Sequence, residues 1–261
     1  MIFEGKMKVV VVKKKKIVFM AVLVLVSILL SISIGGTTAA GVYFGYTTRQ
    51  VPIYAVETEE KKVAITFDSA WGADKTLGIL ENLKQYNAGA TFFLVGFWVE
   101  EYPDMVKAIA DQGIEIGTHS NTHPDFTTLS RAQMEQELTT STKLIKNITN
   151  KDVTLFRSPY GAYNNTSIEV AKGLGLTTIQ WDVDTLDWKG LNGTEITNRV
   201  LSKVTNGSII LCHNNSDHIL EALPLLLSSL VNKGYTITSV GDLILQDNFY
   251  IDHAGVQRVK N

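Results

Sequence analysis

The 261-residue sequence predicts an α/β fold, an irregular β/α barrel of about seven strands preceded by an N-terminal transmembrane or signal segment. Short apolar runs typical of buried strands alternate with segments of helical period, which indicates parallel strands joined by right-handed crossovers. Seven such units approach the number in a closed β/α barrel. An open doubly wound sheet is the alternative, but no glycine-rich phosphate turn follows the first strand.

The N-terminal region combines a basic block with an apolar run. Lys13 to Lys16 are followed by the uncharged residues 17–34, a run just long enough to cross a bilayer with the lysines on the cytoplasmic side. Small residues at 38–40 would also suit cleavage of a secretory signal. We therefore expect an extracytoplasmic domain, either anchored by one helix or secreted. The expected parts are a cytoplasmic basic segment (1–16), the anchor or signal (17–36), a tether (37–60), the domain (61–245) and a tail without periodicity (246–261).

The first half of the domain contains three expected strands and two helices. Apolar residues recur every three or four positions over 75–86 and 104–111, as on one face of a helix. Gly113 lies just past the second of these, where a glycine commonly ends a helix. The expected strands are the apolar runs 63–67, 91–95 and 114–117.

The second half continues the alternation. Ser130 and Gln133 have the spacing of a capping box, and apolar residues on one side of the following segment extend the helix to Ile148. The remaining expected strands are 153–156, 176–181, 208–212 and 235–240, and the remaining helices are 167–173, 194–204 and 224–232.

Charge and cysteine content exclude some functions. The formal net charge is −2, and residues 1–40 carry +5, so the remainder carries −7. An acidic domain is a poor partner for nucleic acid, which requires clustered cations. The single cysteine, Cys212, lies in an apolar run and is expected to be a buried core residue. The sequence does not specify an oligomeric state.

Ionisable residues follow five of the seven expected strands, while the strands themselves are almost purely apolar. In a β/α barrel these strand ends meet at one face, so the residues are expected to share a site. His119 and His123, four residues apart, could converge on a divalent ion of the zinc type, although the pair alone could also be two unrelated loop histidines. The residues that follow the strands are Asp68, His119, His123, Arg157, Asp182, Asp184, Asp187 and His213. They predict a metal-dependent hydrolytic site.

Five ordered blocks resemble the motifs of the polysaccharide deacetylase family, also called the NodB-homology or carbohydrate esterase 4 family. The resemblance extends over about residues 61–240. The blocks are Thr66-Phe67-Asp68, His119-Ser120-x-x-His123, Arg157-x-Pro159-Tyr160-Gly161, Asp184-x-x-Asp187-Trp188 and Leu211-x-His213. Pro52-Ile53-Tyr54 and Ala70-Trp71-Gly72 are similar to the sporulation-associated, PdaB-like branch.

The resemblance implies a distorted β/α barrel that removes N-acetyl groups from amino sugars of peptidoglycan or a chitin-like glycan. It implies a divalent metal, zinc in the first instance, held by His119 and His123. The metal would polarise the amide carbonyl and acidify a water molecule. Asp68 would be the general base for that water, with Arg157 holding its carboxylate.

The resemblance also implies roles on the leaving-group side. The backbone N–H of Tyr160 would stabilise the oxyanion. His213 would protonate the departing amine, and Asp184 would favour the protonated imidazole. Trp188 and Leu211 would form walls of the groove that holds the acetyl methyl group and the sugar face.

The sequence departs from the family pattern at Ser69. The first motif usually reads Thr-Phe-Asp-Asp, and its second aspartate is the third metal ligand, so the chain keeps two imidazoles and loses an anion. Ser69 or a water could complete a weaker site, or Asp74 could reach in from the loop. Two functions follow: a membrane-tethered, metal-dependent deacetylase of a cell-envelope glycan, or a weakly active or inactive glycan-binding protein on the same fold.

Overall fold

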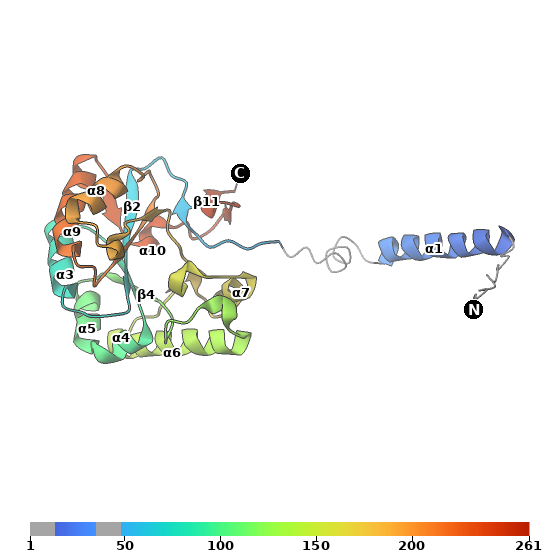
Figure 1. Cartoon of the computed structure of the whole chain (residues 1–261), viewed down its shortest axis with the longest axis horizontal. Coiled ribbons are helices and arrows are strands. Elements are labelled where there is room, and N and C mark those ends of the chain that lie inside the picture. The colour runs from blue at the N-terminus through green and yellow to red at the C-terminus, as the bar shows by residue number, and fades with distance from the viewer. Residues whose placement is uncertain (1–13, 35–47, 261) are drawn as a thin grey trace, which may run out of the picture. The chain divides into compact units, whose positions relative to one another are not determined.

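The computed structural model describes residues 14–34 and 48–260 (Figure 1). The chain divides into two units, residues 1–48 and 49–261, which are treated separately. In the first unit, helix α1 (Lys14–Ile34) covers most of the segment expected as anchor or signal; residues 1–13 and 35–47 lie outside the described ranges. No helix in the described ranges has the length and apolar character needed to cross a membrane.

The domain is built on a curled parallel sheet. Its main path runs β6-β5-β4-β3-β2-β8-β7, and β9 pairs with the beginning of β2. Every neighbouring pair is parallel, as the alternating pattern predicted. All seven expected strands are present, and β7 is an addition. The strands are β2 (Lys62–Ser69), β3 (Thr91–Leu94), β4 (Glu115–Thr118), β5 (Leu155–Phe156), β6 (Thr177–Thr178), β7 (Val183–Asp184), β8 (Ile209–His213) and β9 (Thr236–Thr238).

The sheet is a half-barrel, which corrects the expectation of a nearly closed barrel. Among the described residues, its end strands β6 and β7 do not pair with each other. A segment expected as tether runs between these two ends. Ile53 bridges to Ile179 beside β6, and Ala55 bridges to Ser208 at the start of β8. The tether prediction is therefore wrong for residues 49–60, which belong to the domain.

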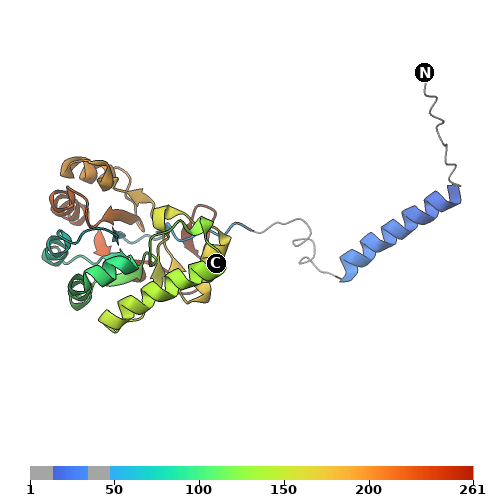
Figure 2. The same ribbon diagram turned by 60° about the horizontal axis from the view of Figure 1, so that its bottom comes forward.

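Helices follow the sheet on its outer side (Figures 1 and 2). Neighbouring helices are in contact in the order α8-α9-α3-α5-α6-α7, which matches the order of the strands they connect. The capping box predicted at Ser130 and Gln133 is present at the start of α6. Helix α9 begins before Pro224, because the preceding turn buries Ile219, Ala222 and Leu223 against the core. The helices are α3 (Thr76–Gln85), α4 (Gly96–Glu101), α5 (Pro103–Asp111), α6 (Arg131–Thr149), α7 (Asn165–Gly173), α8 (Gly193–Leu201), α9 (Ile219–Asn232) and α10 (Val240–Leu243), with 3-10 turns at η1 (Phe126–Thr128), η2 (Pro159–Gly161) and η3 (Asp187–Lys189).

The C-terminal residues are not a tail without structure. Strands β10 (Phe249–Ile251) and β11 (Val256–Val259) form a small sheet with β1 (Ala55–Val56), in the order β1-β11-β10. The buried side chain of Gln257 donates to the carbonyl of Leu245 (2.7 Å) and accepts from its N–H (2.8 Å). The prediction failed because these strands are short and partly exposed, so their sequence has no clear period.

Strand β2 is the centre of the core, with seven of its eight residues buried. Phe67 packs toward the helices, where its ring stacks on that of Phe92 at 4.8 Å. Ala64 faces the other cluster, inside the curl, together with Phe93. A parallel strand covered on both faces is expected to be continuously apolar, so the acidic residue at its end, Asp68, stands out.

Candidate functional site

A cavity of about 560 Å³ lies at the carboxyl ends of β2, β4 and β8. It brings together eight residues that the sequence had singled out for chemistry or substrate contact. Five further candidates are not part of its lining: Arg157, Ser69, Asp74, Asp182 and Asp187. The lining residues are Asp68, Ala70, Trp71, His119, His123, Tyr160, Trp181, Asp184, Trp188, Leu211, His213 and Asn215.

Asp68 is held as a carboxylate by Arg157, which lies fully buried behind it. The Arg157 Nη1 donates to Asp68 Oδ1 (2.8 Å) and to Thr66 Oγ1 (2.7 Å), and Nη2 donates to the carbonyl of Gln180 (3.0 Å). The guanidinium also lies over the ring of Phe93, 4.2 Å from its centroid. Burial alone would raise the pKa of Asp68, but the charge of Arg157, assisted by the nearby histidines, outweighs it and lowers that pKa. The arginine thus keeps a buried carboxyl group deprotonated.

The two predicted metal-ligating histidines lie together, with ring centroids 4.9 Å apart. The Nδ1 of His119 lies 2.7 Å from the carbonyl oxygen of Arg157. Because a carbonyl only accepts, Nδ1 carries the hydrogen and Nε2 has a free lone pair, 3.6 Å from Asp68 Oδ2. Burial lowers the pKa of His119, and burial with the charge of His119 lowers the pKa of His123 to about 4. Both imidazoles are therefore neutral near pH 7, as metal ligation requires.

The site fits a divalent metal ion at two ligand positions. Besides the free Nε2 of His119, the buried Nδ1 of His123 has no hydrogen-bond partner among the described residues. The buried hydroxyl of Ser69 is likewise unpartnered in that part of the chain. Nowhere in residues 14–34 or 48–260 do three His, Cys, Asp or Glu side chains form a metal-binding group.

Asp74 does not complete the site. Its side chain is 71% exposed and lies 3.3 Å from Lys75 Nζ. The possibility that Asp74 replaces the missing carboxylate is therefore wrong for this arrangement of the loop. Ser69, directly after Asp68 on β2, is the other side chain that the sequence suggested as a third ligand.

His213 is oriented by Asp187, not by Asp184 as expected. The Nδ1 of His213 lies 2.7 Å from Asp187 Oδ1, and the His213 backbone N–H donates to Asp187 Oδ2 (2.8 Å). Asp184 instead accepts from the N–H of Leu186 (2.7 Å). Burial would lower the pKa of His213, but the hydrogen bond and charge of Asp187 raise it, with smaller contributions from Asp68 and Asp184. The imidazole therefore favours its protonated form, as an acid requires.

Aromatic side chains form the walls of the cavity. The ring of Tyr160 contacts that of His123 edge-on, with centroids 4.6 Å apart. The indole of Trp71 also contacts the His123 ring edge-on, with centroids 5.1 Å apart. Trp188 is exposed, whereas Leu211 is almost fully buried in the lining. The predicted placement of Trp188 and Leu211 in the groove is thus compatible with the structure.

Several residues of the site have contacts that their sequence pattern did not predict. Asp187 lay inside the fourth motif, but the spacing did not show which of its two aspartates faces His213. Trp181, at the end of an expected strand, lines the cavity and lies 5.4 Å from the guanidinium of Arg157. The hydroxyl of Thr66 belongs to the first motif, and its bond to Arg157 has no signal in the sequence.

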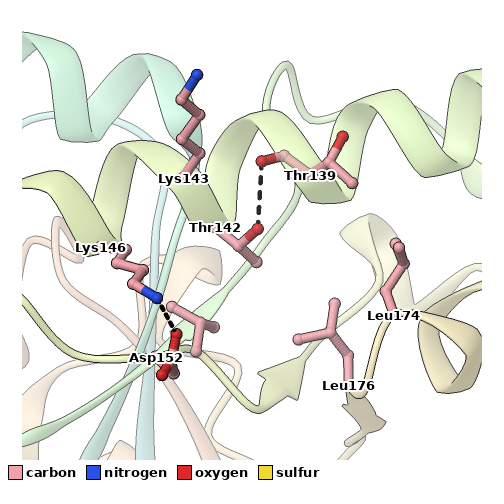
Figure 3. A pocket seen from close by; sticks show the side chains of 8 residues that line it. Thr139, Thr142, Lys143, Lys146, Asp152, Leu174 and Leu176 are labelled. Carbon is pink, nitrogen blue, oxygen red and sulfur yellow. Dashed lines mark hydrogen bonds and ion pairs between the residues drawn. The ribbon is translucent and has the colours of Figure 1, made fainter.

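A second hollow, of about 370 Å³, lies beside α6. Figure 3 shows Lys146 pointing to Asp152, with Nζ 2.6 Å from Oδ1, and Leu174 and Leu176 across from them. The two charges neutralise each other, and the lining contains no histidine and no second carboxylate. This hollow therefore has no catalytic constellation.

Comparison with known proteins shows the family of this domain. The model of the polysaccharide deacetylase family matches residues 55–179. The chain is 34% identical to the peptidoglycan-N-acetylglucosamine deacetylase PgdA of Listeria monocytogenes over 74% of this chain, and spans only 41% of that protein. It is 33% identical to the peptidoglycan-N-acetylmuramic acid deacetylase PdaA of Bacillus subtilis, over 74% of this chain and 75% of PdaA.

Similar solved structures include an inactive relative. A CE4 family pseudoenzyme from Bacillus anthracis has a TM-score of 0.72 and 35% identity, over 74% of this chain and 68% of that one. A mutant of that pseudoenzyme with restored enzymatic activity is equally similar, with a TM-score of 0.72 and 37% identity over 74% of this chain and 71% of the mutant. The chain thus resembles both a pseudoenzyme and a mutant of it that is active.

Proposed function

The chain belongs to the polysaccharide deacetylase family, and from this premise we propose that it hydrolyses N-acetyl groups of amino sugars in a cell-wall glycan. One observation carries the proposal. Two ionisable groups face the same cavity with oppositely shifted pKa values: that of Asp68 is lowered and that of His213 is raised. Such a pair is the arrangement of a base and an acid that act on opposite ends of one reaction.

The reaction joins a water oxygen to the acetyl carbonyl carbon and breaks the C–N bond, giving acetate and a free amine. Asp68 takes the proton from the attacking water, while Arg157 keeps its carboxylate ionised and in place. The protonated His213 gives its Nε2 proton to the departing nitrogen, and Asp187 holds the ring by Nδ1. The backbone N–H of Tyr160, on the cavity wall, would stabilise the oxyanion.

A divalent metal ion, zinc in the first instance, would be held by His119 and His123 with the hydroxyl of Ser69 or a water. It would supply Lewis-acid polarisation of the acetamide carbonyl. Neutral, buried imidazoles with free lone pairs support this assignment.

Acetate release tests the proposal directly. The full chain would be loaded with zinc, cobalt or manganese and incubated with N-acetylglucosamine oligomers and with peptidoglycan. We expect acetate with at least one metal, and its loss in Asp68→Asn and His213→Ala. His213→Ala should still take up the metal, and loss of metal binding in that variant would contradict the role given to His213.

The second candidate function is glycan binding with little or no hydrolysis. It is favoured by Ser69 at the third ligand position, by the lack of a three-residue metal-binding group among the described residues, and by likeness to a pseudoenzyme. Binding of the oligomers without acetate release under any metal, and without zinc uptake, would select this function over the first.

We further propose that the domain acts outside the cytoplasm. This rests on the sequence alone, on the lysine block and the apolar run 17–34. Protease treatment of intact cells tests it, because a domain on the outer side would be digested and a cytoplasmic one would be protected.

A further inference from the structure

Exposed aromatic side chains are concentrated at the cavity. Within residues 48–260, four tryptophan or tyrosine side chains are exposed, and three of them, Trp71 (58%), Tyr160 (70%) and Trp188 (60%), line it. Large aromatic rings that stay in water lose the stabilisation that their burial would give. Clustering of exposed apolar surface at one place marks a binding site.

Trp71 is exposed but its loop is fixed. The carbonyl of the next residue, Gly72, accepts two hydrogen bonds, from Trp98 Nε1 (2.7 Å) and from Asn214 Nδ2 (2.8 Å). Both donor side chains are fully buried. Two core residues thus hold the turn that carries a solvent-exposed ring.

The Trp71 ring also has fixed neighbours. Its centroid lies 6.5 Å from that of Phe97 and 5.1 Å from that of His123. These contacts hold the indole at the cavity edge on the side of the histidines while more than half of its surface stays open. A rigid ring binds a ligand face at lower entropic cost than a mobile one.

We propose that Trp71 is a stacking platform for a second sugar ring of the glycan, adjacent to the sugar whose acetyl group enters the cavity. A pyranose ring presents C–H groups on its faces, and these are attracted to the electron-rich face of an indole. The platform makes the preferred ligand a linear chain of at least two N-acetylhexosamines. The inference rests on the proposed function, because it places the acetylated sugar beside Asp68 and His213.

The dependence of affinity on chain length tests this. β-1,4-linked N-acetylglucosamine oligomers of one to five sugars would be titrated calorimetrically into the full chain. In the parent, affinity should rise from one sugar to two or three. In Trp71→Ala the ratio of the three-sugar to the one-sugar affinity should fall about tenfold, the size of one good aromatic contact. Trp71→Phe should retain part of that ratio.

Tyr250 offers a matched control, an exposed aromatic residue (47%) outside the cavity. Tyr250→Ala should keep the parental ratio. If Trp71→Ala also keeps the parental affinity ratio, or lowers the affinity for oligomers of every length by the same factor, the platform is refuted while the proposed function stands. If the parent binds none of the oligomers, the proposed function and this inference both fail.

Discussion

Replacing Ser69 with aspartate should change metal affinity and stability in opposite directions. The Ser69 side chain is fully buried, and its hydroxyl has no partner among the described residues. Structural zinc sites bind with about 10–16 kcal/mol over four ligands, so one restored anionic ligand should contribute roughly 3 kcal/mol, or about 100-fold in zinc affinity. Without metal, the same carboxylate is buried beside that of Asp68 and should cost at least about 1–3 kcal/mol of unfolding free energy.

The assay combines a zinc titration against a competing chelator with thermal unfolding in zinc and in EDTA. Ser69→Asp should unfold several degrees below the parent in EDTA and be stabilised more than the parent by zinc. Ser69→Asn is the matched control, because asparagine has nearly the same size and shape as aspartate but carries no charge. Equal zinc affinity in Ser69→Asp and Ser69→Asn would refute the view that position 69 adjoins the imidazole pair.

Three further predictions follow from the charged groups of the domain. Asp187→Asn should lower the pKa of His213, which Asp187 raises in the parent. Because the acid must be protonated, the rate is lost as pH rises through this pKa, so the alkaline limb of the pH–rate profile should move to lower pH. An unmoved alkaline limb would contradict the pairing. Arg157→Met should lower the free energy of unfolding in urea by about 3–5 kcal/mol, because it leaves Asp68 buried and unpaired. Adding Asp68→Asn should restore part of that lost stability. A double variant no more stable than Arg157→Met would contradict this reason. Burial raises the pKa of Glu115, so its contribution to stability is full below about pH 4 and falls as pH rises to the folded pKa. Glu115→Gln should therefore be more stable than the parent at pH 8 but not at pH 4. Equal gains in unfolding free energy at both pH values would argue against a buried charge.

Local pattern alone determined the strands, most helices and the shared edge of the site. Apolar runs ending at Asp68, His119 and His213 predicted strands whose ends meet, and the cavity contains all three residues. This inference is reliable because a parallel strand buried on both faces must be apolar along its length, and crossover connections bring all carboxyl ends to one side.

Only the tertiary structure decided which neighbours pair. Asp187 contacts His213, and the preceding Leu186 adopts a left-handed backbone conformation (φ 52°) that a leucine in the sequence does not signal. Ile53 bridges to Ile179 and β1 pairs with β11, in both cases with a partner far along the chain. Such contacts depend on backbone direction and on distant partners, and neither leaves a period in the local sequence.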